Sequence, residues 1–204
     1  IIYCPPNTLI RPMSKKLKNS SIKVGAQNCH QNLTYGAFTG SVNSKMLKDV
    51  GAKYVIIGHS ENRKEGENDK LINAKIKSAL RWNIKVIFCI GESLKEKRKK
   101  ITKKVLIKQI RNGLNRINNK NDIIIAYEPV WSIGTGLIPN SNELLEIITF
   151  IKKKTNNCKT LYGGSVSPKN IKELKSIKNI DGFLVGGASQ DPKKFIDIIK
   201  KTYN

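Results

Sequence analysis

The segment AYEPVWSIGTG, residues 126–136, ends an apolar run with a lone carboxylate, Glu128, and continues with a proline, a tryptophan and two closely spaced glycines. A carboxylate has the chemistry of a general base, provided that its surroundings control water and geometry. A lone acid after a strand is also often a helix cap or half of a surface ion pair. The residue type alone leaves both interpretations open.

A second group capable of acid–base chemistry follows another apolar run, in IIGHSENR, residues 56–63. His59 carries an imidazole, the group that most often transfers protons in enzymes. Ser60 and Glu61, which come next, suit the start of a helix. As an isolated histidine, His59 could equally be a hydrogen-bonded core residue.

Two glycine-rich turns, YGGSV at 162–166 and LVGGAS at 184–189, follow two further apolar runs. Glycines such as Gly186 and Gly187 let backbone N–H groups approach and point at an anion, and the Ser165 hydroxyl is a further donor. Tight βα turns also use glycine, so a single pair is weak evidence. Two pairs after the last two strands favour a phosphate site.

These residues stand between short apolar runs typical of strands and amphipathic stretches typical of helices. The predicted strands are 1–4, 22–28, 53–58, 84–91, 122–128, 158–164 and 182–187. The predicted helices are 43–50, 68–82, a basic segment at 94–110, 140–154, 167–177 and 191–201. Asn140, Ser167 and Asp191 are predicted helix caps.

Strands and helices alternate without a long linker, which predicts a single domain, residues 1–204, built on a parallel sheet. That sheet could be open and doubly wound or closed into a barrel. The GxGxxG sequence of dinucleotide-binding sheets is absent after the first strand, and polar or glycine-rich residues follow nearly every strand. We therefore expect an α/β protein with the (β/α)8 TIM-barrel fold, whose functional loops lie at strand carboxyl ends.

The charge and hydropathy of the chain indicate which kinds of partner, nucleic acid or membrane, it could bind. The chain has 38 Lys plus Arg against 15 Asp plus Glu, a net charge of +23, but lysines recur throughout. The densest cluster, residues 94–110, keeps an apolar face at helical spacing and predicts one solvated helix. Without a zinc finger or an RNP-type sequence, nucleic acid is not the expected partner. The apolar runs are far shorter than the roughly 18 residues of a membrane span, so no membrane partner is expected.

The four cysteines, Cys4, Cys29, Cys89 and Cys158, lie far apart, with no CxxC pair and no histidine at metal-ligand spacing. Buried reduced thiols are therefore expected. This favours a cytoplasmic location, and no metal is expected.

As a set, these sequences resemble the triosephosphate isomerase family. The resemblance rests on AYEPVWSIGTG, IIGHSENR, YGGSV, LVGGAS and QNCHQNLTYGAFTG (27–40), in the family's order, and it runs from Ile1 to the C-terminus. It implies interconversion of dihydroxyacetone phosphate and D-glyceraldehyde 3-phosphate, a step of glycolysis and gluconeogenesis. It implies no metal and no organic cofactor.

The resemblance also implies a role for each acid–base residue. Glu128 matches the catalytic base, His59 matches the electrophile that hydrogen-bonds the substrate carbonyl, and Glu61 matches a supporting carboxylate. The resemblance further implies that a helix N-terminus keeps this imidazole neutral.

Residues 129–136 match the family's mobile lid, with Trp131 as an anchor. The implied phosphate cradle consists of Gly134, Ser165, Gly186 and Gly187. After Gly136 the chain reads Leu137-Ile138-Pro139, which differs from the Lys-Thr-Ala of some family members.

The loop that contains Thr39 matches the segment that reaches into a neighbouring subunit, so a homodimer is expected. Ser41 stands where the family usually has a glutamate after GAFTG. A long loop without a partner is the simpler alternative.

Three other functions remain as alternatives. A different phosphate-binding barrel enzyme would share the glycine pairs but not the EPVWSIGTG and GHSENR sequences. A non-catalytic barrel would bind anions or nucleic acid through the +23 charge. A catalytically dead homologue would dimerise without turnover.

The resemblance begins at the family's second βα unit, so the family's Asn-x-Lys sequence has no counterpart in these 204 residues. A barrel without its first strand and helix would expose two sheet edges, which is an aggregation hazard. We predict that the 204-residue chain is poorly folded and nearly inactive, whereas the product read from the gene's start codon is active. A coupled assay of glyceraldehyde 3-phosphate conversion compares the two, and ordinary turnover by the shorter chain would contradict the prediction.

Overall fold

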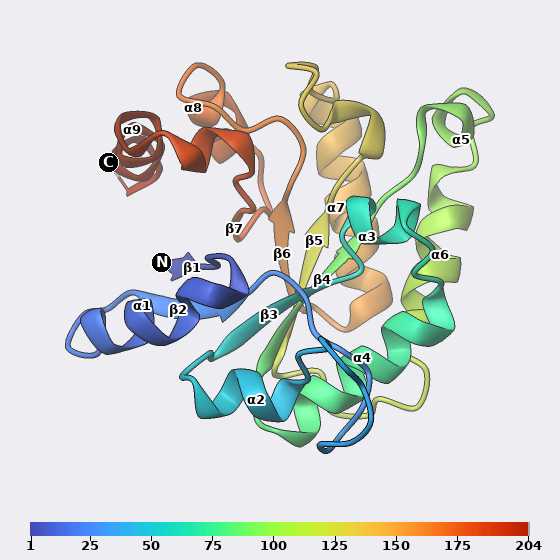
Figure 1. Ribbon diagram of the computed structural model, residues 1–204. Helices are drawn as coiled ribbons and strands as arrows, with labels where there is room; N and C mark the ends of the chain where they lie inside the picture. Colours follow the sequence, from blue (N-terminus) through green and yellow to red (C-terminus); the bar gives the residue numbers. More distant parts are fainter. Residues whose placement is uncertain (204) are drawn as a thin grey trace. The chain divides into compact units, whose positions relative to one another are not determined.

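The computed structural model describes residues 1–203, in which parallel strands alternate with helices (Figure 1). The strands are β1 (Ile2–Tyr3), β2 (Lys23–Ala26), β3 (Tyr54–Ile57), β4 (Lys85–Ile90), β5 (Ile123–Tyr127), β6 (Lys159–Tyr162) and β7 (Gly182–Phe183). The α-helices are α1 (Ile10–Lys16), α2 (Ser44–Asp49), α3 (Ser60–Lys64), α4 (Asp69–Arg81), α5 (Leu94–Arg98), α6 (Thr102–Gly113), α7 (Ser141–Thr155), α8 (Ile171–Ser176) and α9 (Pro192–Tyr203). Three short 3-10 helices are η1 (Asn7–Leu9), η2 (Val130–Ser132) and η3 (Gly187–Gln190).

The strands are hydrogen-bonded in sequence order from β1 to β7. The recorded registers, including Tyr54↔Lys85 between β3 and β4 and Leu161↔Gly182 between β6 and β7, are parallel. Each predicted strand therefore exists, although β1 and β7 are only two residues long. Parallel neighbours joined by helical crossovers confirm the predicted βα repeat.

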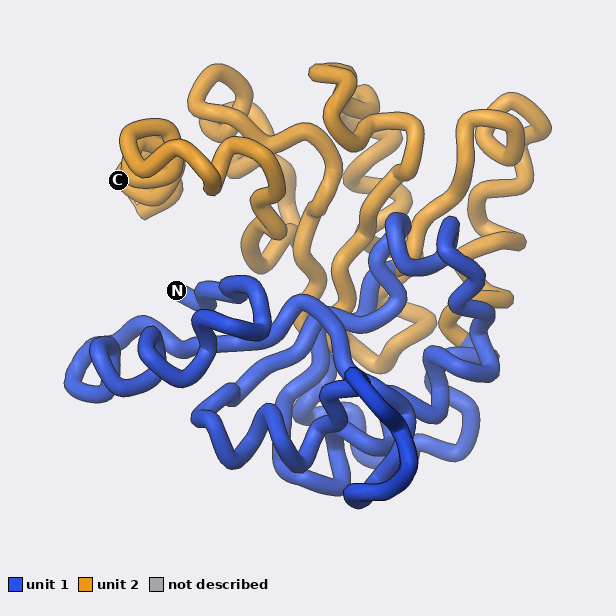
Figure 2. The backbone as a smooth tube through the Cα atoms, in the orientation of Figure 1, with its two compact units in different colours: residues 1–89, 111–124 blue, residues 90–110, 125–204 orange. Residues whose placement is uncertain are grey.

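The chain divides into two compact units (Figure 2). Unit 1 consists of residues 1–89 and 111–124, and unit 2 consists of residues 90–110 and the chain from residue 125 onward. The boundary falls inside β4 and inside β5, so each unit contains part of both strands.

Unit 1 has its core between strands and the apolar face of α4. Ile72, Ile76 and Ala79 of α4 are fully buried, at the i, i+4, i+7 spacing of one helix face. The helix packs on β3. Val86 and Phe88 of β4 are also fully buried, as expected for a parallel strand covered on both faces.

Unit 2 repeats this arrangement with α7. Leu144, Ile148 and Ile151 of α7 are fully buried at the same spacing, and the helix packs on β6. Asn140 caps the helix as predicted, because its side chain accepts a hydrogen bond from the Asn142 N–H at 2.9 Å.

The predicted single helix at 94–110 is wrong, because the segment forms two helices, α5 and α6. Ser93 and Glu96 form a capping box that starts α5. Lys100 then takes a left-handed conformation, with φ of +58°, and ends that helix. The apolar spacing continued across the break, so periodicity alone did not reveal it.

The helix predicted from Ser167 begins only at Ile171. The Asn170 side chain accepts from the Ser167 N–H at 2.8 Å and donates to the Ser165 carbonyl at 2.9 Å. These bonds hold residues 167–170 as a turn, so Ser167 is not the helix cap. The cap predicted at Asp191 is confirmed, since its carboxylate accepts from the Lys193 and Lys194 N–H groups at the start of α9.

Helix α1 was not predicted. Of its seven residues only Ile10 is buried, so it lacks the repeated apolar spacing that identifies the longer helices.

Candidate active site

In unit 1, His59 lies at the turn that joins β3 to α3, as the N-cap of α3. Its Nδ1 atom accepts a hydrogen bond from the Glu61 backbone N–H at 3.4 Å. Gly58, with φ of +77°, turns the chain out of the strand. Arg63 holds this turn by donating from Nε to the Gly58 carbonyl at 2.8 Å. The imidazole is therefore fixed at the carboxyl end of β3 by its own helix.

The Glu61 carboxylate lies beside the same nitrogen. Its Oε2 atom is 3.6 Å from His59 Nδ1, and the Glu61 side chain is 78 % exposed, against 25 % for the His59 side chain. A nitrogen that accepts the Glu61 N–H carries no proton, which leaves Nε2 as the protonated nitrogen of a neutral ring. The structure thus brings the predicted pair His59 and Glu61 together.

In unit 2, Glu128 follows directly after β5 and is only 3 % exposed. Its N–H donates to the Ile90 carbonyl at 2.8 Å. A Cβ atom on Gly163 would lie 2.8 Å from Glu128 Cγ, and one on Gly91 would lie 1.8 Å from the Glu128 carbonyl oxygen. Only glycine fits at these two positions, so both residues make room for the acid, a role that the sequence did not reveal.

The residues on either side of Glu128 bind one buried carboxylate, Glu92. Trp131 donates from Nε1 to Glu92 Oε1 at 2.8 Å, and the Tyr127 hydroxyl donates to Glu92 Oε2 at 3.1 Å. Glu92 is 1 % exposed, and burial raises its pKa even though the Trp131 and Tyr127 hydrogen bonds lower it. Lys97 Nζ lies 3.9 Å from the centre of the Trp131 ring. Glu92 therefore anchors the chain both before and after the candidate base.

The loop after Glu128 contacts the turn after β6. The Gly136 N–H donates to Ser165 Oγ at 3.0 Å, and Ser165 Oγ donates to the Ser132 carbonyl at 2.6 Å. The single proton of the Ser165 hydroxyl is thus directed at the loop, so the hydroxyl does not point a proton at an anion. Gly134 has φ of +70° and open space where a Cβ would lie.

Gly186 and Gly187 lie together at the start of η3 in unit 2. A Cβ atom on either would meet nothing within 4 Å, so their backbones are open to approach. Ser189 donates from its N–H and its hydroxyl to the Gly186 carbonyl, at 2.8 Å and 2.7 Å. These bonds fix the turn that carries the two glycines.

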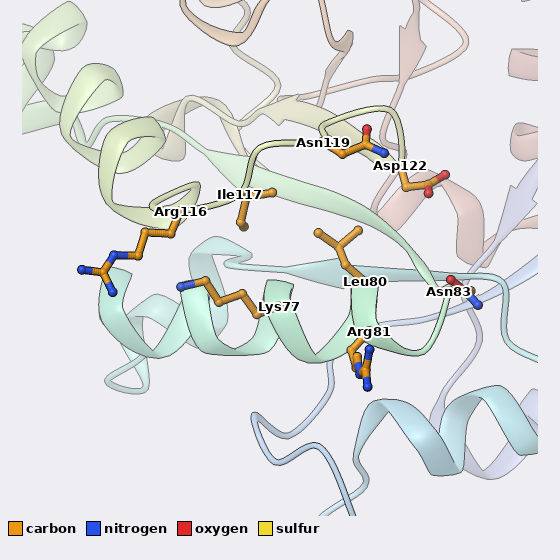
Figure 3. A pocket seen from close by; sticks show the side chains of 8 residues that line it. All are labelled: Lys77, Leu80, Arg81, Asn83, Arg116, Ile117, Asn119 and Asp122. Atoms are coloured by element: carbon orange, nitrogen blue, oxygen red, sulfur yellow. The ribbon is translucent and has the colours of Figure 1, made fainter.

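A pocket of about 430 Å³ lies elsewhere on unit 1 (Figure 3). It is lined by Lys77, Leu80, Arg81, Asn83, Arg116, Ile117, Asn119 and Asp122. Asn83 and Asp122 precede β4 and β5, whereas His59 and Glu128 follow their strands. None of the predicted site residues lines this pocket, so it is not the candidate active site.

Within residues 1–203, no group of three or more His, Cys, Asp or Glu side chains could hold a metal ion. No helix in this part of the chain is long and apolar enough to cross a membrane.

The predicted site residues share one topological position. His59 follows β3, Glu128 follows β5, Ser165 follows β6 and Gly186 follows β7, each at the carboxyl end of a parallel strand. Acid–base groups and open glycine turns at these ends define the class of the protein, a (β/α)-barrel enzyme.

Comparison with known proteins gives the particular family. The family model described as Triosephosphate isomerase matches residues 1–202. The triosephosphate isomerase of Thermodesulfovibrio yellowstonii is 46 % identical over 205 residues, covering 96 % of this chain and 83 % of that protein. That of Carboxydothermus hydrogenoformans is 44 % identical over 212 residues, covering 98 % and 84 %. The chain belongs to the triosephosphate isomerase family.

A solved structure supports the same assignment. The crystal structure of triosephosphate isomerase from Bartonella henselae matches with a TM-score of 0.90 at 35 % identity, covering all of this chain and 86 % of that one. The predicted TIM-barrel fold is therefore confirmed, as is the predicted isomerase class. The family favours this function over the non-catalytic alternatives.

The raised pKa of Glu92 predicts a pH effect on stability. Between its ordinary value of 4.5 and the raised value, the native state holds a proton that the unfolded state has lost, so this group's contribution to stability falls as pH rises. We expect Glu92→Gln to gain stability relative to the unaltered protein as pH rises above about 4.5. Urea unfolding across this pH range measures the difference.

Glu146→Gln is the matched control, because Glu146 is 64 % exposed on α7. A difference between Glu92→Gln and the unaltered protein that stays constant with pH would contradict the prediction.

Proposed function

We propose that this chain interconverts dihydroxyacetone phosphate and D-glyceraldehyde 3-phosphate, with Glu128 as the base. The observation that carries this proposal is the placement of Glu128. The side chain is 3 % exposed, it begins a loop, and that loop is anchored through Trp131 to Glu92. A water-shielded carboxylate beside a closable loop suits proton abstraction next to a carbonyl.

The reaction removes a proton from one substrate carbon and returns a proton to the neighbouring carbon. The Glu128 carboxylate takes a proton from the carbon beside the substrate carbonyl, and the released electron pair forms the carbon–carbon double bond of an enediolate. His59 donates a hydrogen bond from Nε2 to the carbonyl oxygen and moves protons between the two enediolate oxygens. Glu128 then returns its proton to the neighbouring carbon, so no proton or electron is left over.

The α3 cap supports this role for His59. Since Nδ1 accepts the Glu61 N–H at 3.4 Å, the proton of a neutral ring lies on Nε2, where a hydrogen-bond donor is required. We assign Glu61 as the supporting residue, through its backbone N–H and its carboxylate.

The substrate phosphate would bind to backbone donors. Gly134, Gly186 and Gly187 have open space beside their Cα atoms, which lets an anion approach their N–H groups. We assign Ser165 to the same cradle through its turn, while its hydroxyl holds the loop.

We propose a homodimer formed through the loop that contains Thr39. This loop exposes Leu33, Tyr35 and Phe38, which are 48 %, 53 % and 44 % exposed. It is nevertheless held in place, because Trp82 Nε1 donates to the Leu33 carbonyl at 2.7 Å. A fixed loop with three exposed large apolar side chains suits insertion into a second copy of the chain.

We also place the protein in the cytoplasm. The support is chemical: Cys4 and Cys29 form no disulfide, and burial raises their pKa values to about 12 and about 11. Thiols in this state are unreactive and suit a reducing compartment.

Replacing the proposed base tests the function. We expect Glu128→Gln to lower kcat by roughly 10²- to 10⁴-fold, because an amide cannot accept the proton. A coupled assay of glyceraldehyde 3-phosphate conversion, with the protein as its gene encodes it, measures the loss. Glu146→Gln makes the same chemical change on an exposed side chain of α7 and should keep full activity. A folded Glu128→Gln variant with unaltered kcat would rule out Glu128 as the base.

The proposed dimer predicts a difference between two exposed apolar positions. Leu33→Asp should shift the protein to monomers, because a carboxylate would be buried in the contact. Ile196→Asp, at a 50 % exposed position on α9, should leave the dimer intact. Sedimentation equilibrium distinguishes the two outcomes, and a Leu33→Asp protein that remains dimeric would exclude this loop from the interface.

A further inference from the structure

The pocket of about 430 Å³ on unit 1 takes no part in the candidate active site (Figure 3). It lies between the last turns of α4, which supply Lys77, Leu80 and Arg81, and the segment 116–122, which leads from α6 to β5. Its lining residues all belong to unit 1. Its volume falls within the range of roughly 300–1,000 Å³ that is typical of small-molecule sites. The pocket is therefore large enough for an organic ligand and is formed within one unit.

Three basic side chains line this pocket, against one acidic side chain. Lys77 and Arg81 stand four residues apart on one face of α4, and Arg116 follows α6 on the other side of the pocket. The acid is Asp122, which pairs with Lys85 at 3.2 Å between Oδ1 and Nζ. Within residues 1–203, no ion pair engages the three basic side chains. Their positive charge is thus left for a partner from outside the chain.

The two sides of the pocket are held together by hydrogen bonds within unit 1. Asn73 of α4 donates from Nδ2 to the Gly113 carbonyl at 2.8 Å and to the Asn115 carbonyl at 3.0 Å. These bonds fix the end of α6 against α4, directly before Arg116. Arg116 itself has φ of +57°, a left-handed conformation that is unfavourable for a residue with a side chain. The surrounding contacts hold it there, so the pocket is preformed and a ligand loses little free energy in ordering it.

The carbonyl groups at the end of α4 are occupied by the turn that follows the helix. Free carbonyls at a helix C-terminus carry partial negative charge and repel anions. Here the Ala79 carbonyl accepts the Trp82 N–H at 3.1 Å, and the Leu80 carbonyl accepts the Asn83 N–H at 3.0 Å. Arg81, in the last turn, offsets the remaining helix dipole. The basic side chains therefore set the charge of the pocket.

The pocket also has an apolar part. Figure 3 shows the Leu80 and Ile117 side chains between Lys77 and Arg116 on one side and Asn119 on the other. An inorganic ion gains nothing from apolar contact, whereas the carbon skeleton of an organic ligand gains free energy from it. The lining thus suits a ligand with a strongly anionic end and an apolar portion.

We propose that this pocket binds an organic polyphosphate, whose phosphate groups contact Lys77, Arg81 and Arg116 and whose apolar portion, such as a nucleotide base, packs on Leu80 and Ile117. A guanidinium donates two parallel N–H groups to phosphate oxygens, and an ammonium binds phosphate as a point charge. One phosphate group carries at most about two negative charges against three cations, so two or more phosphate groups fit better. The proposal is independent of the isomerase function, because the residues proposed for that function do not line this pocket.

The test measures binding of ADP and of pyrophosphate by isothermal titration calorimetry, in the protein as its gene encodes it. Physiological salt screens the general attraction between a +23 chain and any anion. We expect the triple variant Lys77→Gln, Arg81→Gln, Arg116→Gln to weaken ADP binding by roughly 10- to 100-fold, because charge-assisted hydrogen bonds are lost. Pyrophosphate should bind the unaltered protein several-fold more weakly than ADP, since it has no apolar portion.

Two controls separate this pocket from the net charge and from the candidate active site. The variant Lys172→Gln, Lys175→Gln, Lys178→Gln removes the same charge from exposed positions on and after α8, and it should bind ADP like the unaltered protein. Saturating dihydroxyacetone phosphate should leave ADP bound, because the proposed substrate site has different residues.

Equal weakening of ADP binding in the two triple variants would show a general attraction of anions and overturn the proposal. So would displacement of ADP by dihydroxyacetone phosphate, an outcome that leaves the isomerase function standing. Pyrophosphate that binds as tightly as ADP would refute the apolar part of the site. If circular dichroism shows that the pocket variant is unfolded, Arg81→Gln alone decides, because this side chain is exposed at the end of α4. Several-fold weaker binding then supports the proposal, and unaltered binding refutes it.

Discussion

The close approach of Glu128 to glycine on two sides is the constraint on which the rest of unit 2 depends. Its carboxylate must be shielded from water, yet it stands at a strand end where loops usually bring solvent. Gly91 and Gly163 solve this by letting backbone pack where side chains would otherwise stand. Glu128 is thus buried because its neighbours Gly91 and Gly163 have no side chains, so the chain packs closely around it. The two glycines of YGGSV avoid different clashes. A side chain on Gly163 would clash with Glu128, and one on Gly164 would clash with Tyr162 and Ser132.

Two different anchors hold the chain around this acid, and their chemistry differs. Glu92 is an ionisable group in a dry place, with a pKa that burial raises, and it binds Tyr127 and Trp131 on either side of Glu128. Ser132 is neutral, and its Oγ atom donates to the Leu137 carbonyl, bonds with the Tyr162 hydroxyl and accepts the Ser165 N–H. The first anchor fixes the start of the loop, and the second fixes its end.

The sequence predicted the strands well, because β-branched runs such as 123–126 signal burial locally. It also predicted the His59 turn, since a helix cap is a short-range signal. It did not predict Glu92 or Ser132 as partners of the loop. Trp131 and Glu92 are 39 residues apart and Ser132 and Tyr162 are 30 apart, so no local pattern connects them. The break at Lys100 was missed for the opposite reason, because regular apolar spacing continued across a left-handed residue.

The strength of the second anchor is suited to a loop that must move. For Glu128 to act as the proposed base, substrate has to reach it and product has to leave, so contacts that cover the acid would break and form again in each turnover. Each neutral hydrogen bond of Ser132 contributes about 1 kcal/mol, because its groups bond to water when the contact opens. Several such bonds acting together favour the closed position without making it permanent. A buried ion pair at the same place would leave an unpaired charge on each opening, at a cost of several kcal/mol. Neutral hydrogen-bonding groups therefore suit the end of the loop whose contacts open and close. The ionisable Glu92 suits the start of the loop, which stays fixed.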